Sequence, residues 1–372
     1  MNYKIILFFL FLSLKCFSQN HPPWESPLKI SLSTDGINFN STAIFQDSSG
    51  VPCLIKWKND TLVSVFQWFR QPMNSPSWDR VAVKFSYDNG FTWTQPVPIL
   101  INGLPGNYQR PFDPALVALS SDSLRIYYSS SDGLPMQGLD STINTYSAIS
   151  SDGINYTFES GPRYDHPTNR VIDPSVIYFN GNWNYLAPIG APQDGAYHAT
   201  SSDGIIFNSQ VDYISDNMHN WTGNFMEENS GELRFYGSGA QIWYNASSDG
   251  LSWQGYVNTN LIGGDPSVLK TGNSNYIAIY VGQPYNTSIN ENETVKLFYI
   301  YPNPTKDYVK VKNRNSLPFK YYFYSSEGKL ELQGNNSGTE NISTFDLPDG
   351  IHFLKLLYKN YSEIIKVIKY VN

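Results

Sequence analysis

A short turn motif recurs five times between residues 33 and 253, and it constrains the fold more than any other feature of the chain. Each copy contains a serine, an aspartate and a glycine, with an aromatic residue three positions after the glycine. Asp and Gly favour a tight hairpin turn, and we expect the aromatic ring to pack beneath that turn between sheets. The aspartates are Asp35, Asp88, Asp152, Asp203 and Asp249, and we align with them Ser33, Ser86, Ser151, Ser202 and Ser248.

A second motif alternates with the first, and it marks the start of an alternating apolar strand. Asp113, Asp173 and Asp265 each precede a proline, while Val51 and Gly223 take the same place before the second and fifth turn motifs. The repeating unit is therefore strand, turn, strand, loop, strand, turn motif and strand. This order predicts one four-stranded propeller blade per unit.

The two ends of the repeat region complement each other. The strands expected over residues 265–282 have no turn motif after them, and the motif at Asp35 has no inner strands before it. Joined, they make one complete blade. The sequence thus predicts an all-β protein, a five-bladed β-propeller followed by a small C-terminal β-sandwich.

One copy of the turn motif is complete and carries a resemblance. Residues 86–93 fit the pattern Ser-x-Asp-x-Gly-x-Thr-Trp in full. This pattern resembles the Asp-box, or BNR repeat, of sialidase-like propellers. The expected blades, over roughly residues 28–285, also resemble the five-bladed glycoside hydrolases of families 43 and 32. The resemblance implies that the five Asp-box aspartates are structural and lie on the face opposite the ligand site.

The N-terminal residues are typical of a secretory signal peptide. Lys4 precedes an apolar run over residues 5–12, which is too short to span a bilayer. We expect residues 1–19 to be the signal peptide, 20–286 the propeller and 287–296 a polar linker before a C-terminal domain over 297–372. Cys53 is then the only cysteine left, so no disulfide forms within the mature chain.

The C-terminal segment has an ordered set of motifs. Tyr-Pro-Asn-Pro-Thr at 301–305 is followed by Phe-Tyr-Ser-Ser-Glu-Gly-Lys at 323–329 and Phe-Asp-Leu-Pro-Asp-Gly at 345–350. The segment resembles the type A C-terminal sorting domain of the type IX secretion system of Bacteroidetes. The resemblance implies that the secretion machinery is a partner. It also implies a protein that passes through the periplasm and is then secreted or attached to the cell surface.

Charge and missing motifs exclude several classes of function. Residues 20–298 hold 13 Lys or Arg against 25 Asp or Glu, so nucleic acid is a poor partner. No later stretch approaches the ~18 apolar residues of a transmembrane segment. There is no zinc spacing, P-loop or dinucleotide fingerprint, so no cofactor is expected. Three aspartates near a propeller axis would nevertheless be a potential ligand set for Ca²⁺.

The Asp-Pro aspartates are the main candidate site residues. Because they start innermost strands, we expect Asp113, Asp173 and Asp265 to converge at the channel mouth. Arg110 and Arg170 each stand three residues before one of them. In one interpretation, Asp caps the turn and Arg pairs with it, so that both residues have a structural role and no catalytic one. In the other, Asp113 and Asp173 are the two carboxyl groups that glycoside hydrolysis requires, and Asp265 and the arginines contact substrate.

Residues 51–93 also follow the order of a sialidase first blade. By that resemblance Asp79 falls at the position of the general acid and Arg70 at that of a substrate-contacting arginine. Gly50 departs from the pattern, because it replaces an arginine of the carboxylate-binding triad. Arg70, Arg80, Arg110 and Arg170 remain candidates to bind an anionic sugar through bidentate contacts.

Other residues complete the candidate site. We expect Trp78 to be exposed at the mouth for stacking on a sugar, His198 to point into the mouth, and Glu228 to be solvated on the far face.

Two functions follow from this pattern. The first is a secreted, carbohydrate-active protein, a glycosidase or sialidase-like enzyme acting on extracellular glycans. The alternative is a non-catalytic propeller that binds a glycan or a protein at the cell surface. A purely structural surface protein, which would have no concave polar pocket at the channel mouth, is a third interpretation. The repeated Arg-x-x-Asp-Pro motif favours the enzyme, and Val51 and Gly50, where site residues are expected, favour the binding protein.

Overall fold

The computed structural model describes residues 23–73, 75–120, 122–132, 143–190, 194–228, 231–272, 275–283, 298–313, 318–336, 340–358 and 361–370. The chain divides into two compact units, Met1–Tyr285 and Asn286–Asn372. The described residues form β-strands and two short 3₁₀ turns, η1 (Pro23–Glu25) and η2 (Lys58–Asp60). The predicted all-β class is confirmed. Within these ranges no helix is long and apolar enough to cross a membrane. The predicted signal peptide (1–19) and linker (287–296) lie outside the described residues.

The first unit contains five sheets, of which four have four strands and one has five. We name each sheet after its innermost strand and give its strands from the inside outward. The β3 sheet contains β3 (Ser49–Lys56), β4 (Leu62–Trp68), β5 (Arg80–Ser86) and β6 (Val97–Pro98). The β8 sheet contains β8 (Phe112–Ser120), β9 (Ser123–Ser131), β10 (Ile143–Ser150), β11 (Asn155–Tyr164) and β7 (Leu100–Asn102). The β12 sheet contains β12 (Ser175–Phe179), β13 (Asn182–Pro188), β14 (Ala196–Ser201) and β15 (Asn208–Ser209). The β16 sheet contains β16 (His219–Glu228), β17 (Glu232–Gly239), β18 (Trp243–Ser247) and β19 (Tyr256–Asn258).

The fifth sheet combines the two ends of the unit. It contains β20 (Gly264–Gly272), β21 (Asn275–Val281), β1 (Leu28–Ser33) and β2 (Phe39–Gln46). Strand β1 pairs antiparallel with β21, with Ile30 opposite Ile279. The prediction that the N-terminal strands join the last inner strands is therefore confirmed.

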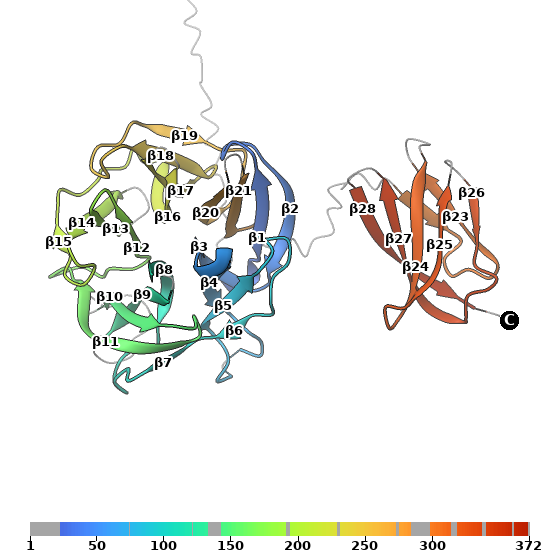
Figure 1. The fold of residues 1–372 in the computed structure, drawn as a ribbon, viewed down its shortest axis with the longest axis horizontal. Helices are drawn as coiled ribbons and strands as arrows, with labels where there is room; N and C mark the ends of the chain where they lie inside the picture. The colour runs from blue at the N-terminus through green and yellow to red at the C-terminus, as the bar shows by residue number, and fades with distance from the viewer. Residues whose placement is uncertain are drawn as a thin grey trace, which may run out of the picture. The chain divides into compact units, whose positions relative to one another are not determined.

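The innermost strands contact one another in a ring. Strand β3 contacts β8, β8 contacts β12, β12 contacts β16, β16 contacts β20, and β20 contacts β3. Side chains link them, since Ser267 Oγ accepts the N–H of Leu54 at 2.9 Å and Ser175 Oγ accepts that of Phe225 at 3.0 Å. Figure 1 shows the five sheets standing around a common centre. Residues at the starts of these strands are thereby brought together at one end of the ring.

Five turns centred on Asp35, Asp88, Asp152, Asp203 and Asp249, which we call the aspartate turns, join the third and fourth strands counted from the centre. In each of them the aspartate accepts hydrogen bonds from a serine hydroxyl two residues earlier and from following backbone N–H groups. The bonded serines of the last three turns are Ser150, Ser201 and Ser247, one residue before those aligned from the sequence.

The aspartate turns also pack on the neighbouring sheet. Tyr127 Oη donates to the carbonyl oxygen of Gly204 at 2.8 Å, and Tyr236 Oη donates to that of Gly36 at 3.1 Å. Each bond joins the second strand of one sheet to the turn of the next. This is a structural role for the turn, as expected from the sequence.

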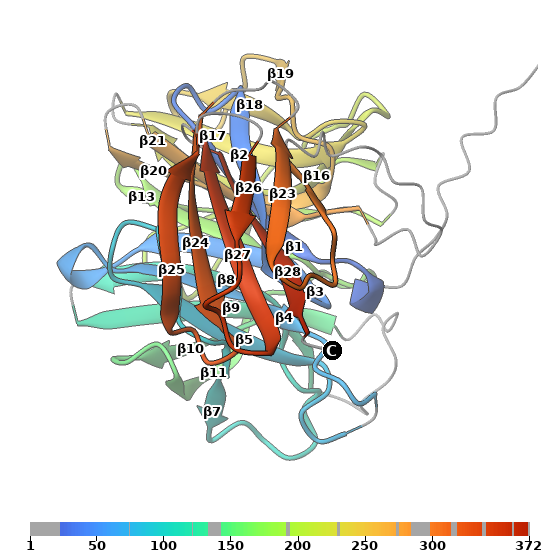
Figure 2. The same ribbon diagram turned by 90° about the vertical axis from the view of Figure 1, so that its right-hand side faces the viewer.

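The second unit has two antiparallel sheets. Phe323, Leu354 and Val367 are among the fully buried residues of its core. Figure 2 shows its larger sheet face-on. One sheet contains β22 (Phe298–Tyr301), β23 (Tyr308–Asn313) and β26 (Glu340–Ser343). The other contains β25 (Leu330–Asn336), β24 (Phe319–Ser325), β27 (Gly350–Tyr358) and β28 (Tyr361–Lys369).

Candidate functional site

Four innermost strands begin with the same unusual backbone conformation. Val51, Asp113, Asp173 and Asp265 each precede a proline and have φ values of 46°, 50°, 50° and 44°. Around three of them the register of the innermost strand shifts, which is the signature of a β-bulge. A bulge redirects a side chain out of the ladder, and bulges are frequent beside functional sites. A positive φ is tolerated by aspartate but is a clear outlier for β-branched Val51.

Three of these positions place carboxyl groups near the ring centre, and we call Asp113, Asp173 and Asp265 the axial aspartates. The backbone N–H of Asp173 donates to Oδ2 of Asp113 at 3.4 Å. The N–H of Asp265 donates to Ser238 Oγ at 2.8 Å. The first bond joins the starts of two neighbouring innermost strands, so Asp113 and Asp173 share one site.

Burial and mutual repulsion perturb these carboxyl groups. Burial, then the charges of Asp265 and Asp79, raises the pKa of Asp113 to about 7, against the opposing effect of the bond from Asp173. Burial and the charges of Asp113 and Asp265 raise the pKa of Asp173 well above its usual range, which Arg170 partly offsets. Burial raises the pKa of Asp265 to about 6. At neutral pH the group therefore retains a bound proton, which is the state an acid–base pair needs.

Asp79 precedes β5 and is tied to Arg110. Its carboxylate accepts a hydrogen bond from Gln67 Nε2 and forms an ion pair with the Arg110 guanidinium. In the first interpretation of the motif, Arg110 pairs with the aspartate of its own repeat. In the structure it pairs instead with Asp79, which directly precedes β5 of the β3 sheet. Asp79 also acts electrostatically on Asp113, so this ion pair borders the axial aspartates.

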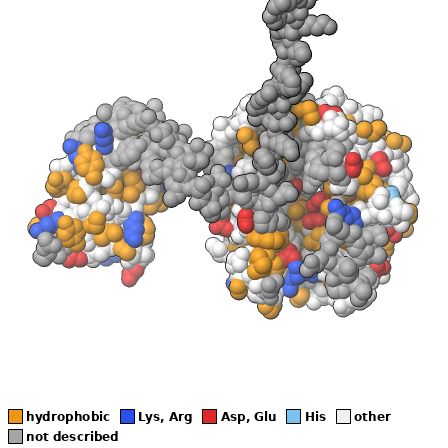
Figure 3. Space-filling view, turned by 180° about the vertical axis from the view of Figure 1, so that it is seen from behind, with side chains coloured by type: hydrophobic (Ala, Val, Ile, Leu, Met, Phe, Trp, Pro, Cys, Tyr) orange, Lys and Arg blue, Asp and Glu red, His pale blue; other side chains and the backbone are white. Residues whose placement is uncertain are grey.

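The other two predicted arginines lie apart from this pair. Arg170 is half-buried and acts on Asp173, and it lines a cavity of about 460 Å³ with Asn169, Asp194 and Tyr197. Arg70 is exposed, with its guanidinium 5.3 Å from the centre of the Trp68 ring. Figure 3 shows acidic side chains beside basic ones near the middle of one face of the first unit.

Two predictions about the mouth are wrong. Trp78 is buried, because its ring packs against Trp24 at 5.8 Å and Phe69 at 5.6 Å between centroids. His198 is also buried and stacks on Tyr213 at 4.7 Å, so it belongs to the packing between sheets. Burial lowers the pKa of His198, which keeps its ring neutral at pH 7.

The predicted solvation of Glu228 is wrong as well. Its side chain is buried and forms ion pairs with Arg234 and Lys270, and Tyr276 Oη donates to it at 2.9 Å. These partners come from strands of the β16 and β20 sheets. The cluster therefore links the β16 sheet to the β20 sheet.

The structure adds Gln67, a residue that sequence reasoning did not select for the site. Gln67 is buried on β4 and holds Asp79, and its Oε1 has no hydrogen-bond partner among the described residues. Arg80, one of the four arginines that the sequence offered for an anionic sugar, follows Asp79 directly and lines a cavity with Arg110. The sequence signal for Gln67 was its place at the mouth end of β4, beside Asp79. No group of three or more His, Cys, Asp and Glu side chains in the described part of the chain is arranged to hold a metal.

Comparison with known proteins identifies the C-terminal unit. Residues 299–370 match the secretion system C-terminal sorting domain. The chain therefore carries a type IX sorting domain, which implies interaction with the secretion machinery, and the protein is secreted or attached to the cell surface. No curated protein matches the chain.

Similar solved structures are distant. An α-L-arabinofuranosidase of Clostridium thermocellum has 13% identity and a TM-score of 0.47, over 78% of this chain and 95% of that one. A family 117 glycoside hydrolase of Zobellia galactanivorans has 11% identity and a TM-score of 0.46, over 67% and 80%. The Trypanosoma rangeli sialidase has 10% identity and a TM-score of 0.38, over 87% and 85%. Because the scores are below 0.5, none of these likenesses assigns an activity.

Proposed function

We propose that the first unit is a five-bladed Asp-box propeller and a secreted glycosidase that acts on extracellular glycans. The ring of five sheets supports the fold assignment. The hydrogen bond from the Asp173 N–H to the Asp113 carboxylate carries the functional assignment, since it puts two carboxyl-bearing residues in one site. Glycoside hydrolysis requires such a pair, one group protonated and one ionised.

The environments of the two groups assign their roles. The Asp173 N–H stabilises the ionised form of Asp113, so Asp113 is the base or nucleophile. Asp173 is buried beside two other carboxyl groups that favour its protonated form, so it is the general acid. The charge of Asp265 raises the pKa values of both Asp113 and Asp173. Arg170 and Arg110 contact the substrate from either side and Arg70 from the rim, while Asp79 positions Arg110.

The test is sugar release by the mature chain from a broad panel of plant, algal and host glycans. Asp113→Asn and Asp173→Asn are expected to lower the rate by about 10²- to 10⁴-fold. Asp122→Asn is the matched control, because Asp122 is exposed at the opposite end of β8. Release that both axial variants retain at the wild-type rate contradicts the proposed mechanism.

One observation favours a second function. Val51 occupies the fourth strand start in the strained conformation of the axial aspartates but has no carboxyl group. A ring that lacks an acid there fits a glycan-binding or protein-binding propeller without catalysis. Binding on a glycan array, with no release from any glycan of the panel, would select this function.

A further inference from the structure

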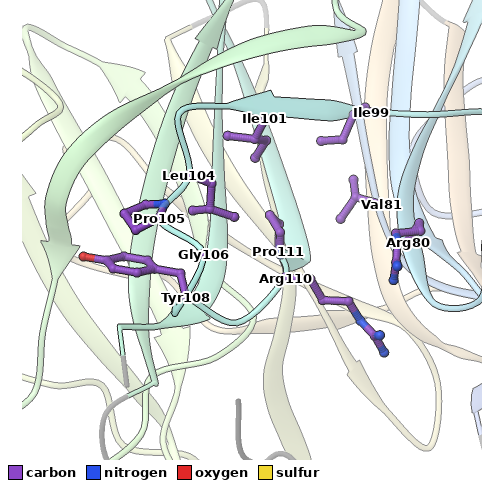
Figure 4. A pocket seen from close by; sticks show the side chains of 10 residues that line it. All are labelled: Arg80, Val81, Ile99, Ile101, Leu104, Pro105, Gly106, Tyr108, Arg110 and Pro111. Atoms are coloured by element: carbon purple, nitrogen blue, oxygen red, sulfur yellow. The ribbon is translucent and has the colours of Figure 1, made fainter. Parts of the chain in front are cut away.

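A cavity of about 360 Å³ lies between the start of β5 and the loop that leads into β8. Figure 4 shows the side chains that line it. Arg80 and Arg110 stand on one side, and apolar residues, among them Ile99, Ile101 and Leu104, make up much of the rest. The cavity therefore has one cationic end and one apolar wall. Its volume suits a single small ligand group.

The wall is held in place before any ligand binds. The N–H of Ile99 donates to the Val81 carbonyl oxygen at 3.0 Å, and that of Leu100 donates to Ile154 at 2.9 Å. The Tyr108 ring lies edge-on to Tyr146 at 5.3 Å and to Phe158 at 5.6 Å. A preformed wall does not have to be ordered when a ligand binds, so the protein loses less conformational entropy on binding.

The charges at the cationic end are unbalanced. Arg110 pairs with Asp79, whereas Arg80 Nη1 donates to the carbonyl oxygens of Trp78 at 3.0 Å and Asp79 at 3.1 Å. Two guanidinium groups therefore share one carboxylate. Burial, followed by the positive charge of Arg110, lowers the pKa of Arg80. An anion in the cavity would relieve this repulsion and accept charge-assisted hydrogen bonds from both arginines.

The cavity adjoins the axial aspartates through Asp79, which pairs with Arg110 and also acts on Asp113. We infer that it binds an acidic sugar unit of the glycan, with the anionic group on Arg80 and Arg110 and an apolar sugar face against Ile99 and Ile101. This inference rests on the proposed function, since it names the substrate class of that site. The anionic group is a carboxylate or a sulfate ester, because each has at least two terminal oxygens that a guanidinium group can bind in a bidentate manner.

The test is isothermal titration of the mature chain with glucuronic acid, galactose 6-sulfate and glucose. The two acids distinguish carboxylate from sulfate, and at least one is expected to bind roughly 10-fold or more tightly than glucose. Arg80→Gln and Arg110→Gln are expected to weaken that binding by about 10- to 100-fold. Lys56→Gln is the control, because Lys56 is a partly exposed cation at the other end of β3, and it is expected to leave binding unchanged.

Two results would overturn the inference. One is equal affinity for glucose and both acids. The other is wild-type affinity in arginine variants that keep the wild-type melting temperature. Binding of an acid without sugar release from any glycan supports the inference and contradicts the proposed hydrolysis. Sugar release from neutral glycans alone, with neither acid bound, supports the proposed hydrolysis and contradicts the inference.

Discussion

Replacing Asp113 by Asn should make the first unit more stable at neutral pH, although it removes a predicted catalytic group. Asn tolerates the positive φ of this position and still offers an oxygen to the Asp173 N–H. The folded chain binds a proton at Asp113 up to a pKa of about 7, against 3.8 as the ordinary value. Between these two values the folded state holds more protons than the unfolded state, so the stability of the wild type falls as pH rises.

The size of the effect follows from the same shift. Each pKa unit corresponds to about 1.4 kcal/mol, and about three units give a ceiling of about 4 kcal/mol for the free energy of unfolding at pH 8. Solvent reaches the half-buried carboxyl and screens its charge, so we expect a gain of about 1–3 kcal/mol. Near pH 4 most of the gain should be lost, because Asp113 is then protonated in the folded protein and partly protonated in the unfolded chain.

Urea unfolding followed by tryptophan fluorescence measures this stability directly. All nine tryptophans lie between residues 24 and 253, so the signal reports the first unit alone. Asp203→Asn is a control for which we expect a change in stability of the opposite sign. Bonds from the Ile206 and Ile205 N–H groups lower the pKa of Asp203 to about 2, so its replacement should destabilise the unit equally at pH 5 and pH 8. A loss of stability in Asp113→Asn at pH 8, or the same change at pH 4 and pH 8, would refute the reasoning.

Two further predictions concern packing. Gly204→Ala should destabilise the first unit by about 3 kcal/mol or more, because φ is +70° and the new Cβ would lie 2.8 Å from Trp183 Cε2. Gly181→Ala, with φ +84° and nothing within 4 Å of its Cβ, should cost only about 1–2 kcal/mol. Equal losses in the urea midpoint would mean that the aspartate turn does not pack as described. Trp78→Ala should cost about 3–5 kcal/mol, since the ring is buried against Trp24 and Phe69. A change below about 0.5 kcal/mol in the same assay is what an exposed ring would give.

The repeat architecture was predictable because its signals are local. An Asp-Gly turn depends on residues within a few positions, and the five aspartate turns form where the motif places them. The joining of the N-terminal and last inner strands followed from counting which repeat parts were missing at each end. The Asp-Pro positions were recognisable as strand starts because the dipeptide recurs at the same place in three repeats. The positive φ of these aspartates was not predictable, since proline favours an extended residue before it.

The site was only partly predictable, because its contacts join distant segments. The motif spacing suggested that Arg110 would pair with Asp113, yet its partner is Asp79, 31 residues away. The burial of Trp78 requires Trp24, which lies 54 positions earlier in the chain. Glu228 stands beside a hairpin turn, as a solvated residue would, but strands of two sheets cover it.

The sequence by itself determined the strands, the turns, the order of the repeats and the sorting domain, because short-range backbone preferences and ordered motifs specify all of these. Only the tertiary structure decided which side chains reach the ring centre and which are covered. Exposure and ion pairing depend on sheets that meet in space from distant parts of the chain. The perturbed axial aspartates are the clearest case, since burial raises all three pKa values and the charges of neighbouring carboxyl groups further raise those of Asp113 and Asp173.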